Sequence, residues 1–354
     1  MKNNEYHILA ALSGGVDSSV VLKLLKPQFK RIMGVSHRHW PESRCCSSAL
    51  FESCRRQCNE MSVEYRVVDT MVDFTEEIVD PFVRAYRSGE TPNPCVYCNQ
   101  KIRFGKMVGK ALQNRGGPED FRLATGHYAR ILKKNGRYWL QRGLDEKKDQ
   151  SYMLYRLSQE QLQRSLFPLG EFTKSQVREK ALAWDLSSSK NPESQDICFI
   201  QDDYRKFIRQ YTGIEESPGD FIDQKGNKLG SHQGISGYNR GMRKGLGLSG
   251  GPWYVLAIRP ESNTVVLGSK EELLTGFFHI SECVWHLPEV PDTLECKIQV
   301  RYHGPELDGR VNRLAEDTFQ ISLDTPSADI SPGQSAVFYS GNTVLGGGII
   351  RNDL

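Results

Sequence analysis

Short apolar runs alternate with helix-like segments through the N-terminal third of the chain. Residues 19–25 begin a predicted helix with apolar residues on one face, and residues 49–61 also have helical character. Four apolar runs are short enough to be buried strands and lie at residues 6–12, 31–36, 65–69 and 121–125. Because strands alternate with helices, we predict an α/β fold whose N-terminal domain is a doubly wound parallel sheet.

The pattern changes after about residue 205, where helix signals become rare. A polar turn at Lys225, Gly226 and Asn227 predicts a small hairpin. Residues 253–267 predict two further strands around a second polar turn. From about residue 278 only strands and turns follow, which favours a C-terminal β-barrel or sandwich, and of these two we predict the barrel. We therefore predict three domains at 1–205, 206–275 and 276–354, the second being small and β-rich.

Composition narrows the class of protein. At 354 residues the chain exceeds the usual size of one hydrophobic core, which agrees with several domains. No apolar run approaches the ~20 residues of a membrane span, and the N-terminal residues do not resemble a signal peptide. We expect a cytoplasmic protein that does not act in a membrane. The net charge of +3 permits a nucleic-acid partner without requiring one.

A glycine-rich loop, SGGVDSS at residues 13–19, lies between the first predicted strand and the first predicted helix. Parallel α/β sheets bind ligands at this edge, and glycines let backbone N–H groups approach a phosphate. The loop lacks the G-x-x-x-x-G-K-[ST] form that grips a transferring γ-phosphate. The alternative is a plain glycine turn followed by a serine helix cap.

Nine cysteines in a cytoplasmic chain indicate buried thiols, catalytic thiols or metal ligands rather than structural disulfides. Cys95 and Cys98 stand in a C-x-x-C spacing within TPNPCVYCNQKIRFG, a proline-punctuated stretch that we expect to be a loop. Cys198 lies in the apolar run ICFI, where a small buried side chain is an equally good interpretation from the residues alone.

The SGGVDSS loop resembles the pyrophosphate loop of the ATP pyrophosphatase superfamily, whose adenine nucleotide alpha hydrolase-like domains adenylate an oxygen of their substrate. The rest of the chain resembles one branch, the tRNA-specific 2-thiouridylases. TPNPCVYCNQKIRFG is similar to that family's T-P-N-P-D-x-x-C-N-x-x-I-K-F. Further matching motifs are ATGHYAR, GLDEKKDQSYMLY, SLFPLGEFTKSQVRE, ESQDICFI, RKGLGL, PWYV and PGQSAVFY.

The resemblance implies the substrates and site residues of a tRNA-uridine 2-sulfurtransferase. It implies ATP with Mg²⁺ at Ala11, Leu12, Ser13, Gly14, Gly15, Val16, Asp17, Ser18, His37 and Gly126. It implies contacts to the flipped target base and the tRNA anticodon stem-loop at Asn93, Pro94, Cys95, His127, Lys148, Asp149, Gln150, Arg301, Tyr302 and Gln334.

The same resemblance assigns the sulfur chemistry to Cys98 and Cys198. Cys198 would carry a persulfide received from a sulfur-relay donor protein, and Cys98 would be the nucleophile that releases or helps transfer that sulfur. A Cys98–Cys198 disulfide can then form and must be reduced. The implied product is 2-thiouridine at the wobble position of tRNAs for Lys, Glu and Gln. A non-catalytic paralogue that binds tRNA or carries sulfur is the alternative function.

Two departures from the family pattern and a separate group of cysteines leave alternatives open. Cys95 replaces the usual Asp, so it is inert, or redox-active with Cys98, or a third ligand with Cys98 and Cys198 of a [4Fe–4S] cluster. YNRGMRKG at residues 238–245 replaces Y-T-I-G-Q-R-K-G, which affects a contact to tRNA or to the sulfur donor. A separate group of cysteines forms a zinc site or, as we favour, buried thiols: Cys45, Cys46, Cys54 and Cys58.

Overall fold

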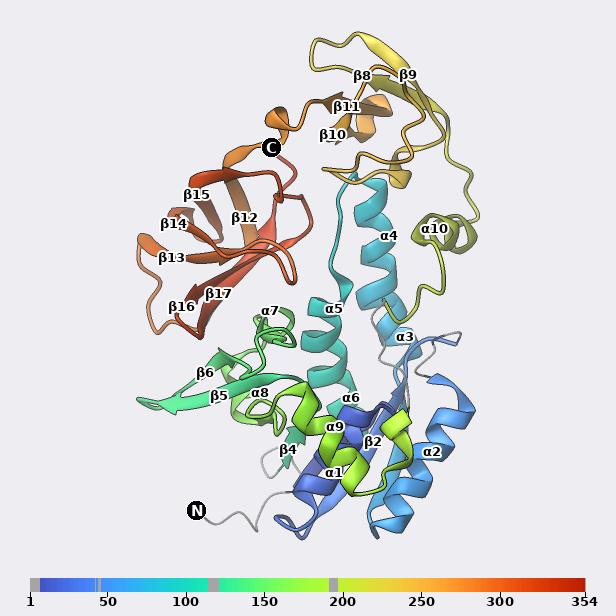
Figure 1. Ribbon diagram of the computed structural model, residues 1–354, viewed down its shortest axis with the longest axis vertical. Helices are drawn as coiled ribbons and strands as arrows, with labels where there is room; N and C mark the ends of the chain where they lie inside the picture. Colours follow the sequence, from blue (N-terminus) through green and yellow to red (C-terminus); the bar gives the residue numbers. More distant parts are fainter. Residues whose placement is uncertain (1–6, 42, 44–45, 114–120, 191–196, 354) are drawn as a thin grey trace. The chain divides into compact units, whose positions relative to one another are not determined.

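The computed structural model describes residues 7–41, 43, 46–113, 121–190 and 197–353. These residues form two compact units (Figure 1). The first comprises the chain up to residue 78 together with residues 95–201 and 342–344, and the second comprises residues 79–94, 202–341 and 345–354. No helix among the described residues is both long and apolar enough to cross a membrane.

The first unit is built on a parallel sheet with strand order β3-β2-β1-β4-β7. This confirms the predicted doubly wound α/β fold, and each of the four predicted strands lies within two residues of an observed one. The prediction missed β7, which has only two residues. The strands are β1 (His7–Ala11), β2 (Ile32–Arg38), β3 (Glu64–Asp69), β4 (Phe121–Ala124) and β7 (Ser165–Leu166).

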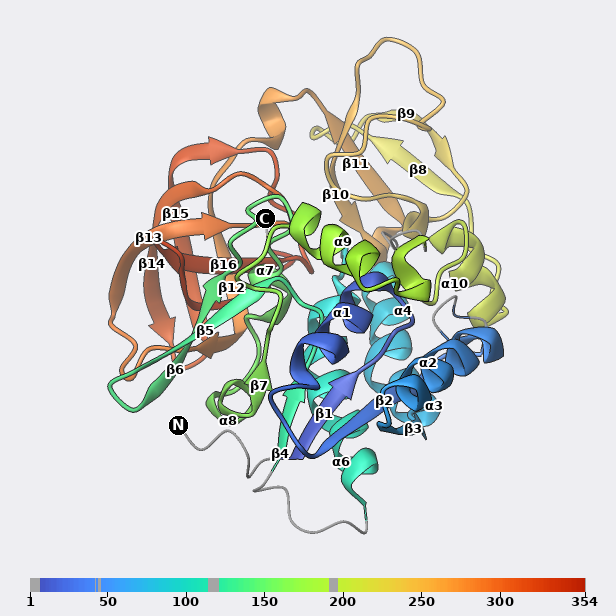
Figure 2. The same cartoon turned by 60° about the horizontal axis from the view of Figure 1, so that its bottom comes forward.

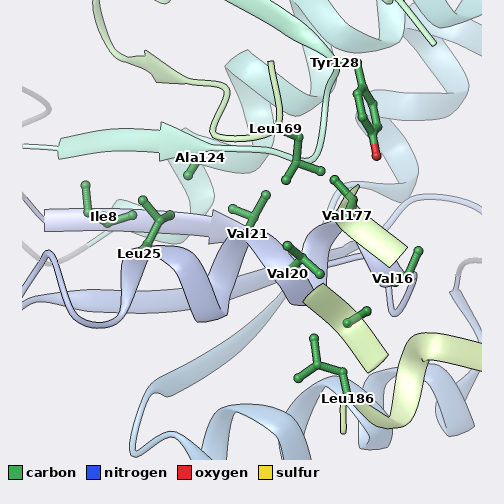
Figure 3. Close-up of a cluster of buried hydrophobic side chains, with 11 residues drawn as sticks. Ile8, Val16, Val20, Val21, Leu25, Ala124, Tyr128, Leu169, Val177 and Leu186 are labelled. Carbon is green, nitrogen blue, oxygen red and sulfur yellow. The ribbon is translucent and has the colours of Figure 1, made fainter. Parts of the chain in front are cut away.

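Helices cover both faces of this sheet. α1 (Val16–Leu25), α2 (Ser48–Glu60) and α9 (Lys174–Ala183) pack on the face that carries Ile8 and Ala10 (Figure 2). In Figure 3, Ile8 of β1 and Ala124 of β4 meet apolar side chains of α1 and α9, which close this half of the core. On the opposite face, Arg66 of β3 donates a hydrogen bond to the carbonyl oxygen of Ala111 in α6 (Met107–Leu112), at 2.8 Å.

Several further elements complete the first unit. An antiparallel hairpin of β5 (Ala129–Lys134) and β6 (Arg137–Arg142) follows β4, and Thr343 pairs with Gln141 beside it. Neither hairpin strand was predicted. The helical elements are α3 (Met71–Phe74), α5 (Pro94–Tyr97), the π-helical segments Thr75–Val79 and Cys98–Lys106, α7 (Ser151–Leu154) and α8 (Gln159–Gln163).

The second unit contains two helices and two β-structures. The helices are α4 (Asp80–Arg87) and α10 (Tyr204–Thr212), joined by a hydrogen bond of 2.6 Å from the Tyr211 hydroxyl to Asp80. A four-stranded sheet has the order β10-β11-β8-β9. It includes both predicted hairpins, in β8 (Gly219–Ile222) with β9 (Lys228–His232) and β10 (Tyr254–Arg259) with β11 (Thr264–Gly268).

The C-terminal strands form a closed barrel, as predicted. The order is β12-β15-β14-β13-β16-β17, and β12 also pairs with β17, so no edge strand remains open. The strands are β12 (Thr275–Trp285), β13 (Thr293–Gln299), β14 (Leu307–Ala315), β15 (Thr318–Ser327), β16 (Ser335–Ser340) and β17 (Thr343–Ile350). The two compact units do not test the three predicted domain boundaries, which stay a prediction.

Two glycines of the first unit predict stability effects of opposite sign. A Cβ at Gly170 would overlap the carbonyl oxygen of Ala129, so we expect Gly170→Ala to lower the free energy of unfolding by about 1–3 kcal/mol. Gly109 lies exposed inside α6 with open space around it, so Gly109→Ala should raise that free energy by about 0.5–1 kcal/mol. Urea unfolding of both variants measures the difference. Equal effects would contradict the packing at Gly170.

Candidate active site

The glycine loop joins the carboxyl end of β1 to the first turn of α1, as expected for an anion-binding loop. Gly14 has a φ of +70°, a left-handed conformation that glycine adopts without strain. Two hydrogen bonds fix the loop, because the Ser18 hydroxyl accepts from the Ser13 N–H at 3.3 Å and donates to the Gly15 carbonyl oxygen at 3.0 Å. The serines therefore preorganise a turn that exposes backbone donors at a helix N-terminus.

Gly126, just beyond the end of β4, packs directly against this loop. A Cβ there would lie 3.1 Å from Cβ of Asp17 and 3.3 Å from the backbone nitrogen of Ser18. The chain order reverses between β1 and β4, so the two loops meet at the topological switch point where α/β proteins bind their ligands. Gly126 is thus needed for close packing of the two loops beside the proposed nucleotide position.

The carboxylate of Asp17 is held by two residues of the same unit. Lys174 Nζ lies 2.8 Å from each of its oxygens, and the Tyr128 hydroxyl donates to Oδ1 at 3.0 Å. The Lys174 side chain is 11% exposed and that of Asp17 is 30% exposed, so the pair is partly shielded from water. Lys174 was not singled out from the sequence, although it is the lysine of the matched F-P-L-G-x-x-x-K motif. Asp17 is therefore a paired carboxylate rather than a free one.

A second cation, Arg103, reaches the end of β4 from the π-helical segment Cys98–Lys106. Its Nη1 donates to Asn99 Oδ1 at 2.9 Å and to His127 Nε2 at 3.2 Å. Nδ1 of His127 faces Thr125 Oγ1 at 2.7 Å, so both ring nitrogens are engaged. Burial, together with the charge of Arg103, holds the pKa of His127 well below its usual value, and the ring is neutral.

Arg103 also acts on two other predicted site residues. Burial is the main cause that lowers the pKa of His37, and the charges of His39 and Arg103 lower it further. Burial raises the pKa of Cys95, and the charge of Arg103 opposes that effect in part. Sequence reasoning missed Arg103, which occupies the position of the family's lysine in N-x-x-I-K-F. Arg103 therefore influences the pKa of residues predicted to contact the base, Cys95 and His127, and of one predicted to contact the nucleotide, His37.

The C-x-x-C segment is helical, which differs from the expected loop. Pro94–Tyr97 forms one α-helical turn, and Cys98 begins the π-helical segment that continues to Lys106. Proline favours the first turn of a helix, so the punctuation that suggested a loop instead starts a helix. Asn99, next to Cys98, anchors the segment by donating from Nδ2 to the Met153 carbonyl oxygen at 3.0 Å.

Cys198 lies in a turn whose neighbour, Phe199, is buried. The Phe199 ring packs edge-on against Phe74 and Trp40, with ring centroids 5.6 Å and 6.2 Å away. Cys198 itself is only partly buried, and its Sγ lies 3.3 Å from Nε2 of the buried His39. The interpretation of Cys198 as a buried hydrophobic side chain is therefore wrong, and its thiol instead faces an imidazole.

The described cysteines do not assemble a metal centre. All are free thiols, and no group of three or more His, Cys, Asp or Glu among the described residues is placed to hold a metal ion. Cys95, Cys98 and Cys198 are thus not gathered as ligands of an iron–sulfur cluster. Cys54 and Cys58 pack in the core beside Leu22, as favoured from the sequence, and burial raises the pKa of Cys58 to about 12. Cys45 lies outside the described residues.

Asp149 and Gln150, which are predicted to contact tRNA, also stabilise the local structure of the first unit. The buried carboxylate of Asp149 accepts hydrogen bonds from the Gly143 N–H, the Ser151 hydroxyl and Arg142. Gln150 Oε1 accepts from the N–H of Tyr128 at 3.1 Å. These contacts fix the connection from the β5–β6 hairpin to α7. Lys148, which precedes them, is partly exposed.

In the second unit, Gln334 anchors the segment that leads to Asn93 and Pro94. Gln334 Nε2 donates to the Thr91 carbonyl oxygen at 2.7 Å, and the Thr91 N–H donates to the Pro332 carbonyl oxygen at 2.8 Å. The predicted tRNA contact of Gln334 thus coincides with a role in holding the chain that precedes the C-x-x-C helix.

Arg301 and Tyr302 lie at the end of β13 in the barrel. Arg301 is 54% exposed and pairs with Asp329 at 3.3 Å, whereas the Tyr302 ring lies against His303 with centroids 3.8 Å apart. An exposed arginine beside an aromatic ring suits contact with a phosphate and a base, as expected from the sequence. Their placement alone does not test that expectation.

Arg240, in the segment that departs from the family pattern, is a structural residue. Its guanidinium donates to the carbonyl oxygens of Ile330 and Leu273, at 2.7 Å and 2.9 Å, and to Thr275 Oγ1. Burial lowers its pKa, and these acceptors compensate for the loss of water. This arginine therefore joins the start of β12 and the residues before it to the loop between β15 and β16.

Comparison with known proteins identifies three consecutive family models. A tRNA methyl transferase HUP domain matches residues 6–202, a tRNA methyl transferase PRC-barrel domain matches 205–269, and an aminomethyltransferase beta-barrel domain matches 276–350. Among solved structures, the chain is similar to the U34-tRNA thiolase NcsA from Methanococcus maripaludis with its [4Fe-4S] cluster. That match has 20% identity and a TM-score of 0.36, and covers 59% of this chain and 66% of that one.

Curated relatives match along almost the whole chain. The tRNA-specific 2-thiouridylase MnmA of Carboxydothermus hydrogenoformans is 42% identical over 98% of both chains. Those of Moorella thermoacetica and Clostridioides difficile are 40% and 38% identical, covering 97% and 98% of this chain and 99% and 98% of theirs. These full-length matches confirm the resemblance inferred from the motifs. The chain belongs to the tRNA-specific 2-thiouridylase family.

Proposed function

We propose that this protein is an ATP-dependent tRNA-uridine 2-sulfurtransferase that makes 2-thiouridine at the wobble position. The observation that carries the proposal is one compact unit that holds both a preorganised glycine loop and two free thiols, Cys98 and Cys198. Replacing a carbonyl oxygen with sulfur needs an activated oxygen and a sulfur nucleophile. Family membership supports both the ATP use and the tRNA substrate.

The proposed first step activates the uridine. The 2-oxygen attacks the α-phosphorus of ATP, a P–O bond to the leaving pyrophosphate breaks, and the oxygen becomes part of a good leaving group, AMP. The loop donors of residues 13–18, and Lys174, which contacts Asp17 of this loop, are proposed to stabilise negative charge on the phosphates. Both oxygens of Asp17 are engaged by Lys174, so Asp17 does not fit as a free magnesium ligand. The proposed first step therefore does not require Asp17 to bind magnesium.

The proposed second step transfers sulfur. The terminal sulfur of a Cys198 persulfide, or sulfide freed from it when Cys98 attacks, forms a bond to C2 as the C2–O bond to AMP breaks. In both routes the Cys98 thiolate displaces sulfur from Cys198, so the protein ends with a Cys98–Cys198 disulfide. A thiol reductant then returns two electrons and restores both thiols. The persulfide comes from a sulfur-relay donor protein.

The target base must leave its stack to reach this chemistry, so the anticodon stem-loop is the proposed binding region. Asn93, Pro94 and Cys95 are proposed to contact the base. Lys148 and, in the barrel, Arg301 and Tyr302 are proposed to contact the tRNA. The central and C-terminal domains would thus contribute tRNA binding. Free thiols in all described cysteines suit the cytoplasm as the proposed compartment.

Deletion of the gene tests the proposal directly. Nucleosides from tRNAs for Lys, Glu and Gln are then analysed by mass spectrometry, and we expect 2-thiouridine to disappear and to return when the wild-type gene is restored. An unchanged level of 2-thiouridine, in a strain with no second copy of the gene, would contradict the proposal. Loss of a methylated nucleoside instead would favour the methyl transfer named in the family-model descriptions. A tRNA-binding paralogue without activity would leave both nucleosides unchanged.

We propose that Cys95 is an inert replacement for the family's aspartate. Burial raises its pKa, so the thiol stays protonated at neutral pH and is a weak nucleophile and a weak metal ligand. We expect Cys95→Ser to retain thiolation within about threefold, since serine preserves the size of the side chain and a weak hydrogen-bonding group. The rate of 2-thiouridine formation with purified protein measures this.

Iron content separates the remaining interpretations of Cys95. Wild-type and Cys95→Ser proteins purified without oxygen are compared for bound iron and visible absorption. Activity that is lost together with iron in the variant would establish the cluster interpretation. Activity lost without any change in iron would instead indicate a redox role with Cys98. The matched variant is Cys283→Ser, a partly exposed barrel cysteine outside the proposed site.

A further inference from the structure

His39 lies between two cysteines directly after β2. Its Nε2 is 3.3 Å from Cys198 Sγ, and its Nδ1 is 3.2 Å from Cys46 Sγ. His39 is 4% exposed and Cys46 is 8% exposed, whereas Cys198 is the more accessible thiol. The two sulfurs face opposite nitrogens of one ring, so a single metal ion cannot bind all three groups. The arrangement instead resembles a histidine oriented toward a reactive thiol.

The partners of Nδ1 assign the tautomer of His39. Nδ1 faces the carbonyl oxygen of His37 at 3.4 Å, and a carbonyl oxygen only accepts hydrogen bonds. Nδ1 must therefore carry the proton in the neutral ring. The thiol of Cys46 is compatible with this tautomer, because its sulfur accepts from the backbone N–H of His39 at 3.4 Å and lies 3.7 Å from the same carbonyl oxygen, within reach to donate to it.

Nε2 is left as the hydrogen-bond acceptor, and the groups it faces are donors. These are the thiol of Cys198 and the hydroxyl of Ser43, at 3.3 Å and 3.4 Å. The ring cannot turn freely, since it stacks on His37 with centroids 4.6 Å apart and tilts against Phe74 at 4.8 Å. Phe74 also packs against Phe199, the neighbour of Cys198. The same phenylalanine therefore contacts both the histidine ring and the turn that carries the thiol.

We propose that His39 accepts the proton of Cys198 and so makes this thiol the reactive nucleophile of the protein. The purpose of the pair rests on the proposed function, in which Cys198 receives sulfur from a persulfide. The Cys198 thiolate attacks the terminal sulfur of the donor R–S–SH, the new S–S bond forms, and the donor S–S bond breaks. The proton held by His39 passes to the departing donor thiolate, giving R–SH. Atoms and electrons balance without an external oxidant.

The groups around His39 permit it to hold that proton. Among the described residues that contact it here, His37, Cys46 and Cys198 are titratable, whereas Ser43 and Phe74 carry no charge. Burial, His39 and Arg103 lower the pKa of His37, so His37 stays neutral and adds no second positive charge. The protonated ring of His39 would keep the His37 carbonyl oxygen at Nδ1 and gain the Cys198 thiolate at Nε2.

Alkylation of Cys198 tests the proposal without tRNA, ATP or a sulfur donor. The full-length protein is reacted with iodoacetamide at neutral pH and at a pH about two units above the ordinary thiol pKa, where an accessible thiol is ionised, and each cysteine peptide is quantified by mass spectrometry. At neutral pH the wild-type Cys198 rate should be about a quarter or more of its alkaline limit, against about 3% for an ordinary thiol. Because no thiolation is measured, failure of this inference and failure of the proposed function are distinguishable.

The decisive variant is His39→Gln, with His7→Gln as its matched control. His7 is an exposed histidine at the start of β1 and contacts Arg31 rather than a cysteine. We expect His39→Gln to slow Cys198 alkylation about tenfold at neutral pH and to leave the alkaline rate unchanged. Cys98 in the same digest should keep its rate. His7→Gln should change neither.

Two outcomes would overturn the proposal. The first is a Cys198 rate in His39→Gln that equals wild type at neutral pH. The second is a rate reduced equally at both pH values, which would show a purely structural effect on access to the sulfur. If circular dichroism shows that His39→Gln does not fold, the wild-type profile alone decides, since a rate at neutral pH of only a few per cent of the alkaline limit contradicts a proton acceptor.

Discussion

Cys198→Ser is expected to abolish formation of 2-thiouridine while leaving tRNA binding nearly intact. A serine hydroxyl cannot carry a persulfide, so the sulfur has no route from the donor to the activated uridine. We expect a fall of at least ~10³-fold in the single-turnover rate, the size seen when a covalent nucleophile is removed. Cys98→Ser should cause a similar loss, because the sulfur bound to Cys198 is then not released.

The two cysteine variants should nevertheless differ in what accumulates. With a persulfide donor present, Cys98→Ser should retain sulfur on Cys198, visible as one added sulfur in the mass of the intact protein. Cys198→Ser should carry none at that position. Both should bind tRNA within about twofold of wild type in a filter-binding measurement, since the proposed phosphate contacts lie elsewhere.

Cys283→Ser provides the matched control for these losses. Cys283 is a free, partly exposed cysteine of β12 in the barrel, and its replacement should keep full activity. Thiolation that persists in Cys198→Ser would remove this residue from the proposed reaction. Loss of tRNA binding in the same variant would mean that the effect is on folding or on the RNA surface rather than on sulfur transfer.

The sheet of the first unit could be predicted because its strands are long enough to leave a local signal. β1, β2 and β4 contain short buried runs, β3 carries the local run Val67–Val68, and helical segments or turns separate the four strands. β7 has two residues, Ser165 and Leu166, and its pairing with β4 depends on contacts far along the chain. The β5–β6 hairpin was missed because it carries many charged residues, and only Ala129 and Leu140 among its hydrophobic residues are fully buried.

The site was predictable where a motif carries its chemistry in consecutive residues. The glycine loop is such a motif, since the strand, the turn and the helix follow one another directly. Lys174 meets Asp17 only after the chain has passed through β4 and the β5–β6 hairpin, so no local pattern shows that pairing. The contact of His39 with Cys198 likewise joins the end of β2 to a distant turn.

Prediction also failed where the residue types permit two local structures. Proline before Cys95 suits both a turn and the first turn of a helix, and the helix forms in this chain. The wide turns of the following segment place Asn99 and Arg103 so that one amide and one guanidinium meet. Such π-helical turns are frequent at functional sites but have no sequence signature of their own.

Lys174→Met is expected to reduce formation of AMP from ATP and tRNA by about 10²- to 10³-fold. The change removes the cation that contacts both carboxylate oxygens of Asp17, and with it a positive charge beside the loop proposed to hold the phosphates. The Tyr128 hydroxyl would remain as a hydrogen-bond donor to the Asp17 carboxylate. We therefore also expect a loss of about 1–3 kcal/mol in the free energy of unfolding.

Lys23→Met is the matched control, since Lys23 is an exposed residue of α1 and undergoes the same chemical change. The double variant Asp17→Asn with Lys174→Met separates the two effects of Lys174. If the lysine acts only by neutralising Asp17, the double variant should recover most of the lost stability and activity. If the lysine also stabilises charge on the phosphates, stability should recover and the rate of AMP formation should not.

The steady-state constants locate the step that Lys174 affects. A higher KM for ATP with an unchanged kcat would mean that the lysine contributes equally to the bound substrate and the transition state. A lower kcat at unchanged KM would place its effect in the transition state, where charge builds up on the leaving pyrophosphate. We expect the second result, because the ion pair with Asp17 already fixes the position of Nζ and leaves little to be gained on binding. AMP formation at the wild-type rate in Lys174→Met would contradict the assignment of this loop as the nucleotide site.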